Sequence, residues 1–140
     1  MATIQFPNVL LNPGTFNANV LDNNGAPSTV LDAGQQFTIR CTWDISPLAA
    51  LILGGEFQVA AYVESIGPGR EQQVGPTVTR ALNGGTNFAA DIVVPANTLP
   101  NNLPPGQSGA YKLVTLLTHR NFGSVSDVSA LVEGPVLRIS

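Results

Sequence analysis

The clearest pattern in this 140-residue chain is the strict alternation of apolar and polar residues from Phe37 to Trp43. Successive side chains of a β-strand point to opposite faces, so this spacing predicts a strand with one buried and one solvated face. We expect Trp43 to pack with Phe37 and Ile39 in a core and to have no ligand role. Cys41 shares that apolar face, and we expect it to be a buried structural thiol, because an apolar environment makes a thiol inert.

Further strands are predicted wherever alternating or apolar runs lie between turn residues. The chain contains 14 Gly and 11 Pro, and clusters such as Asn83-Gly84-Gly85 supply the backbone conformations that tight turns need. The other predicted strands cover residues 15–21, 55–66, 77–82, 87–94, 109–120 and 131–139. Gly134-Pro135 interrupts the last of these strands, which suits an edge strand or a bulge. About seven short strands in one domain predict an all-β, antiparallel β-sandwich.

One short helix is predicted over residues 48–53. Ser46 is a suitable N-cap, Pro47 suits the first helical position because an N–H there would be unpaired anyway, and Gly54-Gly55 can end the helix. The segment is wholly apolar, although it lies between two predicted strands. Because leaving it in water is unfavourable, we expect it to lie at one end of the sandwich with part of it in a subunit contact.

The first 13 residues are expected to form an N-terminal arm, and residues 14–140 the sandwich itself. The arm contains Pro7 and Pro13, alternates poorly and is rich in large apolar residues. One interpretation is that the arm adds itself to an exposed sheet edge of the next subunit. The other is that it forms the first strand of its own sheet. Both interpretations fit the sequence.

Two runs of residues resemble a known family. The run from Leu31 to Ile39, followed by Trp43, resembles the beginning of the second strand in bacterial immunoglobulin-like and fibronectin type III-like modules. Pro104-Pro105-Gly106, leading to Tyr111, resembles their tyrosine corner. The resemblance implies an immunoglobulin-like fold and a Tyr111 hydroxyl that bonds to the preceding connection.

The resemblance covers about residues 14–139 and departs from antibody domains at Leu113, which stands where they have their second cysteine.

Cys41 is the only cysteine and cannot form an intrachain disulfide, so the fold does not depend on an oxidising compartment and is compatible with the cytoplasm. The first residues lack the basic region and apolar run of a signal peptide. We therefore expect that, if the assembly is extracellular, the protein is exported by another route or the given chain is already processed.

The sequence offers little for catalysis. His119 is the only histidine, so a Ser-His-Asp or Cys-His mechanism would have to use it. One histidine and one cysteine do not supply the usual four nitrogen and sulfur ligands of zinc. The spacing of the acidic residues selects no pair for glycoside hydrolysis. We expect no enzymatic activity, no metal and no cofactor.

Charge and hydropathy exclude two further classes of function. The net charge is -3, and the six basic residues are scattered, whereas nucleic-acid binding needs a basic stripe. The longest apolar run, Pro47 to Leu53, is far shorter than the roughly 18 residues of a membrane span. Charged residues make up only 11% of the chain, against about 25% in typical domains, so electrostatic repulsion between copies is weak.

These features predict a non-enzymatic structural subunit that assembles with itself or with partner proteins into a filament, tube, shell or appendage. In the strand from residue 112 to 118, Val114 and Leu116 are expected to face outward. The expected contact residues are Ile4, Phe6, Val9, Leu10, Leu11, Leu48, Leu51, Ile52 and Leu53. The alternative is a carbohydrate- or protein-binding module, for which Tyr62 is the one amphipathic ring without a structural role.

Overall fold

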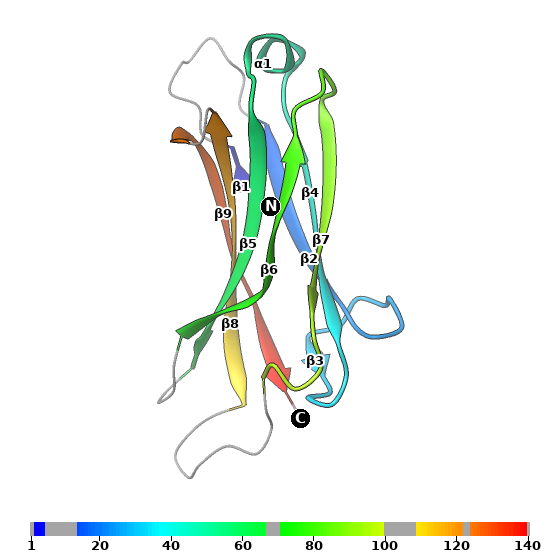
Figure 1. Ribbon diagram of the computed structural model, residues 1–140. Coiled ribbons are helices and arrows are strands. Elements are labelled where there is room, and N and C mark those ends of the chain that lie inside the picture. The colour runs from blue at the N-terminus through cyan, green and yellow to red at the C-terminus, as the bar shows by residue number, and fades with distance from the viewer. Residues whose placement is uncertain (1, 5–13, 67–70, 100–108, 122–123, 140) are drawn as a thin grey trace.

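The computed structural model describes residues 2–4, 14–66, 71–99, 109–121 and 124–139. These residues form two β-sheets packed face to face and one short helix, so the predicted all-β sandwich is confirmed (Figure 1). The first sheet has the strand order β1 (Ala2–Thr3), β2 (Thr15–Leu21), β4 (Phe37–Asp44), β7 (Asn87–Val94). The second has the order β3 (Val30–Leu31), β9 (Ser124–Ile139), β8 (Ala110–Asn121), β5 (Glu56–Ser65), β6 (Glu71–Ala81).

The strands differ from the prediction in number and in length. β1 and β3 each contain two residues, which is too short for an alternating pattern. β3 was not predicted, and β1 was expected only in the interpretation that the arm forms the first strand of its own sheet. β3 pairs with β9 in parallel, so the sandwich is not wholly antiparallel. β6 and β9 begin at Glu71 and Ser124 instead of residues 77 and 131. Bulges interrupt the pairing of both strands with their neighbours, and an interrupted strand loses its regular alternation.

The core lies between the two sheets and is organised around Trp43. Phe37, Ile39 and Trp43 are buried on one face of β4, as the alternation predicted. The Trp43 ring stacks on Phe88 at a centroid distance of 5.6 Å. It meets the ring of Phe57 edge-on at 5.8 Å. The prediction that Trp43 is a core residue is confirmed.

The edges of the two sheets meet where β6 runs beside β7 (Figure 1). The Arg80 Nε donates a hydrogen bond of 3.0 Å to the Ala89 carbonyl oxygen across this junction. Gly75 adopts a φ of +70°, and a Cβ on it would lie 2.7 Å from Cγ2 of Ile92. The close approach of β6 and β7 therefore needs a glycine at this position.

The beginning of the chain belongs to the sandwich. β1 pairs with β2, and the Ile4 N–H donates a hydrogen bond of 2.8 Å to the Gly14 carbonyl oxygen. The Ile4 side chain is fully buried in the chain's own core. In this structure residues 2–4 belong to the chain's own sandwich, which favours the interpretation of a first strand over an exchanged arm and leaves no Ile4 surface exposed for a partner. The other expected arm contacts, Phe6, Val9, Leu10 and Leu11, lie outside the described residues.

Candidate functional site

The predicted helix is confirmed as α1 (Pro47–Ile52), which connects β4 to β5 at one end of the sandwich (Figure 1). The Ser46 Oγ accepts a hydrogen bond of 3.1 Å from the Ala49 N–H and so caps the helix. Pro47 occupies the first turn, where its missing N–H costs nothing. Ala49 and Ala50 are buried against the sandwich. Their small side chains let the helix lie close to the ends of the strands.

The opposite face of α1 presents three large apolar side chains to solvent. The exposed fractions are 48% for Leu48, 83% for Leu51 and 59% for Ile52. Residues three and four apart lie on one face of a helix, so these side chains form one patch, which we call the α1 patch. Leu53, also an expected contact residue, packs against the core and is only partly exposed. The helix is therefore apolar on both sides.

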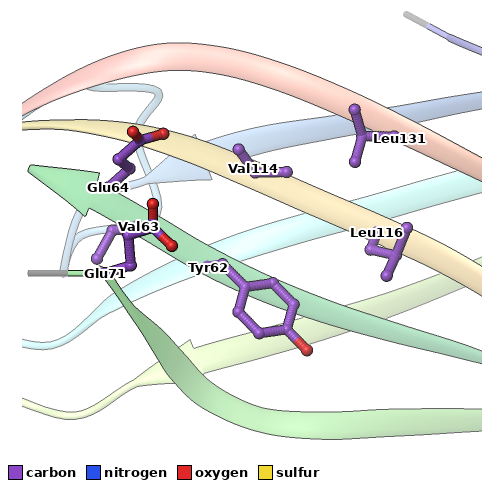
Figure 2. A pocket seen from close by; sticks show the side chains of 7 residues that line it. All are labelled: Tyr62, Val63, Glu64, Glu71, Val114, Leu116 and Leu131. Carbon is purple, nitrogen blue, oxygen red and sulfur yellow. The ribbon is translucent and has the colours of Figure 1, made fainter.

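A second apolar surface lies on the outer face of the five-stranded sheet. It is a shallow groove with a volume of about 260 Å³, which we call the Tyr62 groove (Figure 2). Its lining residues come from four strands and are Tyr62, Val63, Glu64, Glu71, Val114, Leu116 and Leu131. Val114 and Leu116 are partly exposed, so their predicted outward orientation is confirmed. Tyr62, which had no structural role in the sequence, is 39% exposed here.

Sequence reasoning missed Glu71 and Leu131 as members of this groove. Leu131 lies opposite Leu116 in the pairing of β8 with β9, and Glu71 lies opposite Glu64 in the pairing of β5 with β6. Only the strand register brings these residues together. The sequence signals that pointed to this face were the outward-facing apolar residues of β8 and the unassigned Tyr62 ring.

Cys41 and His119 have structural roles. Burial raises the pKa of the Cys41 thiol to about 12, so the nucleophilic thiolate is suppressed at neutral pH and the expected inert thiol is confirmed. The buried His119 ring has its Nε2 2.6 Å from the Gly54 carbonyl oxygen and its Nδ1 2.7 Å from the Ser126 Oγ. A carbonyl only accepts, so the Nε2–H donates to Gly54 and Nδ1 accepts from the hydroxyl. His119 thus ties the end of α1 to the sheet.

The other chemical features are few. Within the described ranges, no three His, Cys, Asp or Glu side chains gather as metal ligands. No helix in the described part of the chain is long and apolar enough to cross a membrane. Tyr111 is buried, but the preceding connection at residues 100–108 lies outside the described residues, and with it the expected tyrosine corner.

Comparison with known proteins gives a likeness in fold. No protein-family model and no curated protein matches the chain. The structure is similar to part of a β-glucosidase from Listeria innocua in complex with glucose, with a TM-score of 0.52 and 10% identity over 90% of this chain and 16% of that one. The complex of the same enzyme with gluconolactone gives a TM-score of 0.51 and 11% identity over the same shares. The chain therefore spans about a sixth of these proteins, and the likeness concerns the fold alone.

Proposed function

We propose that this protein is a non-enzymatic β-sandwich subunit that assembles with further copies of itself through the α1 patch. The observation that carries the proposal is the exposure of Leu48, Leu51 and Ile52 on one face of a well-capped helix. Single exposed apolar residues are normal, but three contiguous ones at the end of a domain are typical of an interaction site.

The free energy supports a contact centred on Leu51. Fully burying a leucine or isoleucine side chain stabilises a contact by about 1.5–3 kcal/mol, and Leu51 is the most exposed of the three. A stable interface buries about 800 Å² on each partner, so the patch supplies the centre of a contact and the surrounding loops its rim. If the α1 patch meets a different surface of the next copy, repetition of the contact generates a ring or an open filament, whereas contact of the patch with itself closes a dimer.

The strand order supports an immunoglobulin-like module as the scaffold. In immunoglobulin-like domains, the chain passes repeatedly from one sheet to the other, as it does here between β4 and β5 and between β7 and β8. In such a scaffold the loops that connect the strands lie at the two ends of the sandwich, and residues of these loops make the contacts with partners. The position of α1 at one end fits this arrangement.

The test is the particle size of the purified chain and of Leu51→Asp, measured by sedimentation velocity and light scattering over a range of concentrations. We expect the wild type to form particles larger than 14.6 kDa and Leu51→Asp to dissociate them. The matched control is Val30→Asp, since Val30 is 63% exposed on β3 at the opposite end of the sandwich (Figure 1). A wild-type monomer at every concentration would refute self-assembly and favour the binding module.

A further inference from the structure

We propose that the Tyr62 groove binds an extended segment of another protein in which a lysine or arginine is followed, at two-residue intervals, by apolar side chains. This inference is independent of the α1 patch. It rests on the size of the groove, on the spacing of its rows and on the charges at one end.

The size of the groove excludes a large ligand. Its volume of about 260 Å³ falls below the roughly 300–1,000 Å³ of typical small-molecule sites. The groove is open along the sheet face, and its lining is mostly apolar (Figure 2). It can therefore take a few side chains of a longer segment that continues beyond it.

The strand register divides the groove into three rows along β5. Glu64 faces outward in the first row, Tyr62 in the second and Ala60 in the third, where Leu116 and Leu131 complete the row. Figure 2 shows the two carboxylates at one end, Tyr62 in the middle and the two leucines at the other end. Outward residues of a strand repeat about every 6.6–6.8 Å, so an extended segment aligned with β5 presents alternate side chains to successive rows.

The charges at the first row select a cation. Glu64 and Glu71 lie directly opposite each other in the pairing of β5 with β6, an arrangement that like charges make unfavourable. In the described part of the chain, neither carboxylate has a hydrogen-bond or ion-pair partner. Lys112 lies opposite Glu64 in the pairing of β5 with β8, but its ammonium is paired with Glu133 at 3.0 Å, so the three carboxylates share one cation among the described residues. A basic side chain from a partner would relieve the repulsion, and its apolar neighbours would cover Tyr62 and the leucines.

A second copy of this chain fits the groove less well than a basic partner. Among the described residues, the groove and its immediate border carry Glu64, Glu71 and Glu133 against one cation, Lys112, while Arg138 lies farther along the same face, so two grooves brought together would repel each other. An oligosaccharide also fits less well, because a sugar needs hydrogen-bonding groups along its whole length. The groove offers such groups only at Tyr62 and at the carboxylate end.

The test uses a cyclic β-hairpin peptide in which one strand reads Arg-Thr-Leu-Thr-Leu, added to the ¹⁵N-labelled full chain and followed by NMR. We expect shifts of the amide signals in the three rows and a Kd that rises about tenfold or more in the Glu64→Gln/Glu71→Gln double variant. Glu56→Gln is the matched control, because Glu56 lies on the same strand outside the groove. Its Kd should equal that of the wild type.

Two further peptides make the result decisive. A hairpin with Glu in place of Arg should bind much more weakly, as should one that places Arg and both Leu residues consecutively. Equal binding of either peptide, an unchanged Kd in the double variant, or shifts confined to other surfaces would overturn the proposal. Concentration-dependent shifts in the same rows without peptide would assign the groove to a second copy, and equivalent shifts with laminarihexaose would assign it to a carbohydrate.

Discussion

Replacing Trp43 tests the account of the core. The ring lies among Phe16, Phe57 and Phe88 at centroid distances of 5.6–6.2 Å. Trp43→Ala removes these contacts and leaves a cavity, for which we expect a loss of about 4–5 kcal/mol. The buried Trp43 Nε1 has no hydrogen-bond partner within the described residues. Trp43→Phe keeps a ring in place and removes that unpaired donor, so its cost should be only about 1–2 kcal/mol.

The assay is urea unfolding followed by far-UV circular dichroism, because Trp43 is the only tryptophan and its fluorescence is lost in both variants. With an m-value of about 2 kcal/mol/M, Trp43→Ala should lower the midpoint by about 2 M and Trp43→Phe by less than about 1 M. A loss below about 1 kcal/mol for Trp43→Ala would show that the ring is not central to the core. Equal losses in the two variants would show that a phenyl ring restores none of the lost packing, which would contradict the account of the core.

Two further predictions concern the Asp44 carboxylate and the strand glycine Gly75, with the turn glycine Gly84 as a comparison for the latter. The Thr15 hydroxyl and N–H donate to the Asp44 carboxylate and lower its pKa. The ionised carboxylate therefore stabilises the fold at pH values above the ordinary pKa of an aspartate, and this stabilisation is lost as the pH falls through the lowered pKa. In thermal melts, Asp44→Asn should be less stable than the wild type at neutral pH, and the difference should shrink below about pH 4. Gly75→Ala should cost about 2–4 kcal/mol from its positive φ and its clash with Ile92. Gly84→Ala, where φ is also positive but nothing lies within 4 Å of the new Cβ, should cost about 1–2 kcal/mol in the same urea titration.

The sequence predicted the parts of the fold that local patterns determine. β4 alternates apolar and polar residues without interruption, burial alternates along β8, and each of these strands appears close to its predicted range. α1 was predictable because its cap, its proline and its terminal glycines all lie next to one another in the chain. β3 was missed and β1 was left as one of two alternatives, because two residues are too few to show a periodicity and their strand pairing is not visible in the local sequence.

The two candidate sites also differ in how far local sequence patterns determine them. The α1 patch could be predicted because its residues are neighbours in the chain and their composition alone is unfavourable in water. The Tyr62 groove depends on the registers of β5, β6, β8 and β9, which a bulge shifts without any clear mark in the sequence. Ile4 was assigned to a partner because its apolar character was visible, but its pairing with Gly14 was not.

The two outer faces of the sandwich differ in character, and this contrast supports the proposed binding surface. On the four-stranded sheet, the outward residues of β4 are Thr38, Arg40, Thr42 and Asp44, and Arg40 forms an exposed ion pair with Asp91 at 3.0 Å. That face is suited to water. The five-stranded sheet instead exposes an apolar groove, and two unpaired carboxylates lie at its end within the described part of the chain. If the sandwich had no partner, the exposed Leu131 side chain would add nothing to its stability, because a polar side chain at the same exposed position would leave the fold equally stable in water. The α1 patch and the groove are formed by different residues, so Leu51→Asp should abolish assembly and leave the Kd for the basic peptide unchanged.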